Sequence, residues 1–188
     1  QGSVYAAGTA VTLGGSNQVG RNAYLTGYGV ETQSGSQVQR DLITAAYQAL
    51  LSGSVERNVN ASVAALVISG DIGGDVRADV AAPGAAGFTF VAPPGAPARV
   101  PPGIRVTEGA EIGGQLVYVS PERQEDAIQA EPGEGIVFRT PVPDARQQAQ
   151  RRDGRGLGFL VLQWIVARLR DLVTLLLLGA LLLWLLPR

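Results

Sequence analysis

Four aspartates in the first half of the sequence are the residues best suited to chemistry: they are Asp41, Asp71, Asp75 and Asp79. Clustered carboxylates can hold a calcium ion, and an arginine beside them can serve as the base of a polysaccharide lyase. The alternative is that carboxylates at such positions accept hydrogen bonds from the backbone amides of turns. We favour this second interpretation, so a carbohydrate-acting enzyme is the function that we favour least.

Three arginines, Arg21, Arg40 and Arg57, occupy the third position of a repeated tetrapeptide. Equivalent residues of stacked repeats lie over one another, so these side chains are predicted to form a ladder with a spacing of about 5 Å along one edge. Such a ladder is a candidate surface for binding anions or glycans. Because like charges at that distance repel, it needs counter-ions or carboxylates. We favour a solvated face in which neighbouring Asn, Asp and Glu side chains separate the charges.

The composition argues against several other classes of function. The chain has no His, whereas hexapeptide-repeat acyltransferases usually rely on His as a general base. It has no Cys, which excludes disulfides and thiolate metal sites. A net charge of −1 gives no reason to expect a nucleic-acid partner. We therefore predict a protein that is not an enzyme, with no catalytic, cofactor or metal site and no small-molecule substrate.

The elements that carry these residues repeat along the chain. Four tetrapeptides begin at Val19, Val38, Val55 and Ile72, spaced 19, 17 and 17 positions apart. Other apolar positions keep the same register, because the change in length falls within polar, Gly/Ser-rich connections. These further columns are Val4, Ala23, Leu42, Val59 and Val76; Val11, Val30, Ala49 and Leu66; and Leu13, Thr32, Leu51 and Ile68. Stacked repeats accommodate insertions in their loops in this way.

A period near 17 residues is too short for a helix-pair repeat, which needs about 34. It fits one coil of a β-solenoid made of three short strands. Within a coil, Val59, Ala61 and Val63 are expected to point inward, while Asn60 and Ser62 point outward. The predicted fold is therefore all-β, a parallel β-helix.

The β-helix is predicted over residues 1–140, with a Pro-rich excursion at 92–103 that leaves the coil. Before it, Phe88-Thr89-Phe90-Val91 is a candidate strand. Ile112 lies 40 positions after Ile72, which we interpret as two coils plus the excursion. Residues 141–156 are polar and rich in Arg, which is typical of a solvated linker.

The remaining residues, 157–188, predict an interfacial helix that leads into a transmembrane helix. Leu172 to Leu186 is uncharged and rich in Leu, and a start at Leu169 gives about 27 Å of helix against a hydrocarbon core of ~30 Å. The residues expected in the bilayer are Leu169, Leu172, Leu176, Gly179, Leu183 and Trp184. The alternative is an amphipathic helix packed on the end of the solenoid, but a thin β-helix has no room to bury so apolar a run.

The sequence Ile72-Gly73-Gly74-Asp75-Val76, its echo Ile112-Gly113-Gly114-Gln115-Leu116 and the coils of about 17 residues resemble the bactofilin-like, polymer-forming cytoskeletal proteins of bacteria, in their membrane-anchored type. The resemblance covers about residues 1–140. It implies a right-handed parallel β-helix, self-association through solenoid ends without nucleotide, and a scaffolding role. Membrane-anchored relatives typically carry a signal sequence, so it also favours an extracytoplasmic solenoid.

The arginines before the predicted span favour the opposite orientation, with the solenoid in the cytoplasm, and both orientations stay open. The function we predict is a membrane-anchored scaffold whose partners are copies of itself and the lipid bilayer. The alternative is an accessory or surface-binding subunit of a larger membrane complex, with close helix packing at Gly179-Ala180. Four tyrosines, Tyr5, Tyr24, Tyr28 and Tyr47, form a candidate aromatic patch for such a partner.

Overall fold

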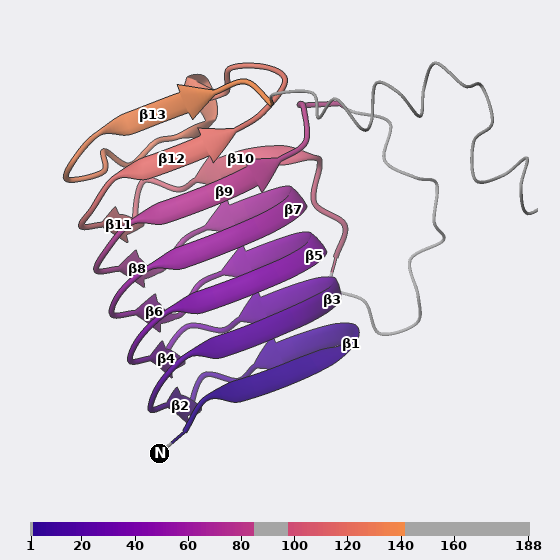
Figure 1. The fold of residues 1–188 in the computed structure, drawn as a ribbon, viewed down its shortest axis with the longest axis vertical. Coiled ribbons are helices and arrows are strands. Elements are labelled where there is room, and N and C mark those ends of the chain that lie inside the picture. The colour runs from indigo at the N-terminus through magenta and orange to yellow at the C-terminus, as the bar shows by residue number, and fades with distance from the viewer. Residues whose placement is uncertain (1, 85–97, 142–188) are drawn as a thin grey trace, which may run out of the picture. The chain divides into compact units, whose positions relative to one another are not determined.

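In the computed structural model, the described residues, 2–84 and 98–141, form a parallel β-solenoid of about six turns (Figure 1). Almost all of the regular structure is β-strand, as the sequence predicts. The prediction of a parallel all-β solenoid is confirmed.

Each regular coil consists of one long strand and one short strand. The long strands have ten residues each and are β1 (Val4–Leu13), β3 (Ala23–Thr32), β5 (Leu42–Leu51) and β7 (Val59–Ile68). The short strands have two residues each and are β2 (Gln18–Val19), β4 (Gln37–Val38), β6 (Ser54–Val55), β8 (Asp71–Ile72) and β11 (Glu111–Ile112). The later coils use β9 (Val76–Val80), β10 (Gly103–Val106), β12 (Leu116–Val119), β13 (Ile136–Arg139) and a short 3-10 helix, η1 (Glu125–Ala127).

The long strands bend once, so that each contributes to two faces of the coil. The bend is visible in the pairing of β7, whose first half lies beside β9 and whose second half lies beside β10. At this point Ala65 and Leu66 are both buried, which breaks the alternation of inward and outward side chains. The short strands form the third face.

The coils stack in the register that the sequence predicts. Val19 pairs with Val38, Val38 with Val55, and Val55 with Ile72. The first apolar column runs unbroken through the long strands, pairing Val4, Ala23, Leu42, Val59 and Val76 in turn. The 19-residue coils differ from the 17-residue ones only in the turns, so the columns stay aligned.

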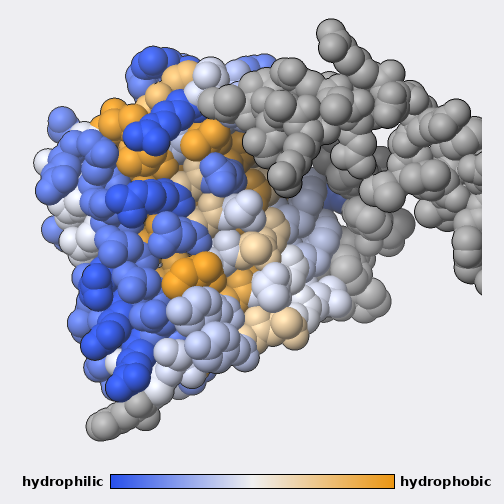
Figure 2. Space-filling model, in the orientation of Figure 1, coloured by the Kyte–Doolittle hydropathy of each residue, from blue (hydrophilic) through white to orange (hydrophobic). Residues whose placement is uncertain are grey.

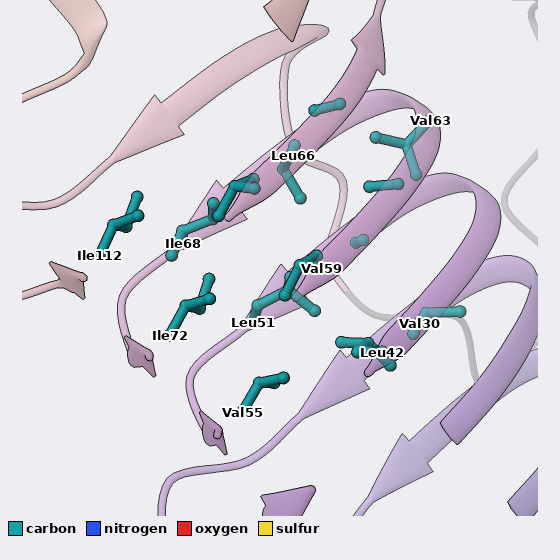
Figure 3. Packing of buried hydrophobic residues seen from close by; sticks show 14 of the residues in the cluster. Val30, Leu42, Leu51, Val55, Val59, Val63, Leu66, Ile68, Ile72 and Ile112 are labelled. Carbon is teal, nitrogen blue, oxygen red and sulfur yellow. The ribbon is translucent and has the colours of Figure 1, made fainter. Parts of the chain in front are cut away.

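The interior is filled by small and branched aliphatic side chains. Val59 is 0 % exposed and Val63 is 7 % exposed, while Ser62 between them lies at the surface. Figure 3 shows Val55, Ile72 and Ile112 one above another in successive coils. Full burial of such a side chain stabilises a fold by about 1.5–3 kcal/mol, so the stacked columns supply the main stabilisation.

A polar ladder follows the turn between the third face and the first. Asn58 donates from Nδ2 to Asp41 Oδ1 at 3.0 Å and accepts at Oδ1 from the backbone N–H of Asp75, also at 3.0 Å. Asp75 Oδ1 in turn accepts from the backbone N–H of Gln115 at 3.1 Å. Each of these side chains therefore accepts a hydrogen bond from a backbone N–H of the next coil. That N–H lies in a turn, so no neighbouring strand offers it an acceptor.

A long insertion interrupts the fifth coil at its corner. Strand β9 ends at Val80, opposite Val63, and β10 begins at Gly103, opposite Ala65. Residues 81–102 thus take the place of one corner residue. Ile112 pairs directly with Ile72, so our expectation of two coils between them is wrong: the two residues are one coil apart, and the insertion lies inside that coil.

The predicted excursion at 92–103 is therefore the later part of a longer insertion. Its residues 92–97, together with the candidate strand Phe88–Val91, lie outside the described residues. The part that returns to the solenoid, residues 98–102, runs upward beside the lower coils to β10 (Figure 1).

The last coil is irregular but keeps the stacking. Ile128 forms a bridge with Val106, and β13 pairs with β12. Residues around Ile128 and Ile136 therefore complete a final, imperfect coil. The linker beyond residue 141 and the predicted interfacial and transmembrane helices lie outside the described residues. Residues 2–84 and 98–141 contain no helix that has the length and apolarity of a membrane span.

Candidate binding surfaces

The N-terminal end of the solenoid is open. The inward column residue Val4 is 36 % exposed, whereas its equivalents Ala23 and Leu42 in the next two coils are 0 % exposed. A hollow of about 370 Å³ reaches into the interior at this end. Its apolar lining comes from Val4, Ala6, Val11, Leu13, Val19 and Leu25. The core is therefore not closed by side chains at this end.

The backbone is also unpaired at this end. Strand β1 is the terminal strand of the large sheet, and β2 is the terminal strand of the small one. Over its ten residues β1 pairs with β3 on one side and has no strand partner on the other side among the described residues. A long edge strand with free N–H and C=O groups beside exposed apolar side chains is a template for adding a further strand.

The outer surface of the first face is shallow and carries Tyr5 and Tyr24, whereas Tyr28 and Tyr47 lie at the corner where the long strands bend. Tyr5 stacks on Tyr24 with ring centroids 4.6 Å apart, and Tyr28 stacks on Tyr47 at 5.1 Å. Two open hollows of about 320 and 420 Å³ meet at Ile43 and Ala45. The four tyrosines therefore form two separate stacked pairs, in which the ring faces cover each other, and the Tyr28 hydroxyl is buried.

The arginine ladder lies on the side of the short strands. Figure 2 shows that hydrophilic residues gather along this side, with hydrophobic residues over the long strands. Arg57 donates its backbone N–H to Arg40 O at 3.3 Å, which places the two residues in adjacent coils. Arg57 Nε is 3.9 Å from Asp41 Oδ1, and in the described part of the chain Arg21 and Arg40 have no ion-pair partner.

The four candidate aspartates do not form one site. Asp41 and Asp75 belong to the polar ladder, where they accept backbone amides as we expected of turn carboxylates. Asp71 lies in β8 and Asp79 in β9, both exposed. Nowhere in residues 2–84 and 98–141 do three or more His, Cys, Asp or Glu side chains come close enough to hold a metal ion.

Two buried glutamines were missed by sequence reasoning, and both hold the insertion. Gln124 accepts at Oε1 from the backbone N–H of Ile104 at 2.8 Å and donates from Nε2 to Ala81 O at 3.1 Å. It therefore joins the point where the insertion leaves the coil to the point where it returns. Gly103 beside it has a φ of 113°, and a Cβ there would collide with Gln124 Oε1. Gln48 holds the returning limb through hydrogen bonds to Ala98 and Val100. In the sequence, a single Gln among apolar residues is the only indication of this role.

No protein-family model, curated protein or solved structure matches the chain.

Proposed function

We propose that the protein is a structural scaffold whose solenoids associate end to end, anchored to a membrane by residues 157–188. The observation that carries the proposal is the open N-terminal end. It combines an unpaired ten-residue strand edge with inward side chains that reach full burial only where another coil covers them. A second solenoid end supplies both the missing backbone partners and the missing apolar cover.

The shape of the solenoid supports a scaffolding role. The hollows on its first face are open and shallow. A rod of stacked coils instead presents repeated surfaces at fixed spacing. The partner in this proposal is another copy of the chain.

The anchoring part of the proposal rests on the sequence. The uncharged run from Leu172 to Leu186 approaches the length of a membrane span. Anchoring raises the local concentration of solenoids at one surface, which favours association between their ends. We place the solenoid on the extracytoplasmic side, by the resemblance to membrane-anchored bactofilin-like proteins.

The test is to charge the open end without altering the body of the solenoid. Val11 points inward in the first coil, since it pairs with the fully buried Val30. In Val11→Arg the added guanidinium can reach water through the open end, but it becomes buried when a second end docks. We expect the full chain in detergent micelles to form end-to-end oligomers by sedimentation velocity and electron microscopy, and Val11→Arg to remain monomeric.

The matched control is Thr12→Arg, which adds the same charge to the exposed, outward face of β1. It should associate as the unchanged chain does, and circular dichroism should show that both variants are folded. A chain that stays monomeric at all concentrations, or association unaffected by Val11→Arg, contradicts the proposal. Purification as discrete particles with other subunits would instead favour the accessory-subunit function.

A further inference from the structure

Two unpaired arginines lie in adjacent coils at the N-terminal part of the short-strand side. Arg21 follows β2 and Arg40 follows β4, and these strands pair directly with each other. Adjacent strands are about 4.8 Å apart, so the two exposed positive charges lie in neighbouring rungs. In the described part of the chain neither guanidinium has a hydrogen-bond or ion-pair partner, and like charges this close repel unless an anion lies between them.

The ladder is confined to the first three coils. The backbone N–H of Gly74 donates to Arg57 O, and that of Gly114 donates to Gly74 O, so the next two positions of the same column are glycines. Arg57 itself lies beside Asp41. Arg21 and Arg40 are therefore the two arginines of the ladder without an ion-pair partner among the described residues.

A polar hollow lies beside Arg21, and Arg40 follows one of its lining residues, Gln39. It measures about 470 Å³ and is lined by Gln18, Gly20, Arg21 and Gln39. Gly20 contributes no side chain, which leaves room between the two glutamines. Each glutamine amide offers both hydrogen-bond donors and an acceptor, while a guanidinium offers only donors.

This lining distinguishes between kinds of anion. The oxygens of a sulfate or a phosphodiester only accept hydrogen bonds, and donors alone satisfy them. A sugar acid carries a carboxylate for the guanidinium and hydroxyl groups that both donate and accept, as the amides do. Successive coils are about 4.8 Å apart, so one linear chain that runs along the solenoid can contact both Arg21 and Arg40.

We propose that Arg21, Arg40, Gln18 and Gln39 form a binding site for a carboxylate-bearing sugar chain. The arginines bind the carboxylates of successive units, and the two amides bind ring hydroxyls. The site lies on the outer side of the first two coils, and its Gln18 also lines the hollow at the open end. It gives the scaffold a specific contact with an acidic polysaccharide.

The experiment uses trigalacturonic acid as the probe, with maltotriose as a neutral trimer of the same linkage type. Calorimetry on the full chain in detergent micelles at low salt measures the dissociation constants. We expect the acidic trimer to bind, with Arg21→Gln and Arg40→Gln each weakening binding by roughly fivefold or more. Gln39→Leu should weaken binding too, because it removes an amide but no charge.

Arg105→Gln is the matched control, since Arg105 is also exposed but lies in β10, on another face. It should leave the dissociation constant unchanged. Equal binding of maltotriose, equal loss of affinity in Arg105→Gln, or phosphate that displaces the trimer at equal concentration would each overturn the proposal. So would a Gln39→Leu variant that binds like the unchanged chain, because the site would then recognise charge alone.

Discussion

The backbone N–H of Val100, in the returning limb of the insertion, donates to Oε1 of Gln48 in β5 at 3.1 Å. Nε2 of the same side chain donates to Ala98 O at 2.9 Å. Gln48 is 0 % exposed although it belongs to the outward column of its face, where it pairs with Ala65. The Gln48 amide therefore makes the two hydrogen bonds that a neighbouring strand would make. It holds the limb against β5, two coils before β10, where the insertion rejoins the solenoid.

Replacement of this amide should release the limb. In Gln48→Leu the N–H of Val100 and the carbonyl of Ala98 lose their partner, and we expect a loss of about 1–3 kcal/mol in stability. The limb contains Arg99, so limited trypsin digestion followed by mass spectrometry should show faster cleavage after this residue. Gln37→Leu, at an exposed position of β4, is the control and should leave the cleavage rate unchanged.

A carboxylate in the core should unfold the solenoid. Val59 is 0 % exposed and lies in the column between Leu42 and Val76, so Val59→Asp should cost several kcal/mol. Ala45→Asp adds the same group at an exposed position of β5 and should be tolerated. Circular dichroism melting checks both, and an unchanged midpoint in Val59→Asp would show that the column is not interior.

One core position carries a hydroxyl that weakens the fold. Thr44 is 2 % exposed, and its Oγ1 has no hydrogen-bond partner among the described residues. Thr44→Val keeps the shape and removes the buried hydroxyl, so it should raise stability by about 1 kcal/mol. Thr26→Val is the control, because Thr26 Oγ1 donates to Ala45 O at 2.8 Å. If a denaturant titration finds no gain in the free energy of unfolding for Thr44→Val, the Thr44 hydroxyl is not a buried group that lacks a hydrogen-bond partner.

The polar ladder should respond to pH once a third carboxylate joins it. Asn58→Asp removes the donor to Asp41 and places a carboxylate between Asp41 and Asp75. Below about pH 4 the added group is protonated and uncharged, and above it the like charges repel. The variant should therefore lose stability relative to the unchanged chain as the pH rises from about 4 to about 7.

The same substitution at Asn60, on the outer surface of β7, is the control for this effect. Asn60 has Arg77 as its neighbour in the next coil, so Asn60→Asp should keep its stability over that range. Thermal melts at a series of pH values compare the two. Parallel pH profiles for the two variants would show that the ladder does not couple the coils.

Much of the fold follows from the sequence alone, because a solenoid is built from local repetition. The side chain at one position of a coil lies over the same position of the next, so the columns beginning at Val4 and Val19 could be read from spacing and confirmed by pairing. The turn role of Asp41 and Asp75 followed from the same repetition. The alternation through Val59, Ser62 and Val63 followed from the two-residue period of a strand.

Only the tertiary structure decided what happens where the repetition stops. The sequence could not show that the insertion occupies a single corner, because the spacing from Ile72 to Ile112 suits one interrupted coil or two shorter ones. The roles of Gln48 and Gln124 depend on contacts between residues 20 or more positions apart, which leave no periodic signal. The open end and the hollow beside Arg21 likewise exist only once the coils are stacked, because exposure is a property of neighbouring coils and not of a residue type.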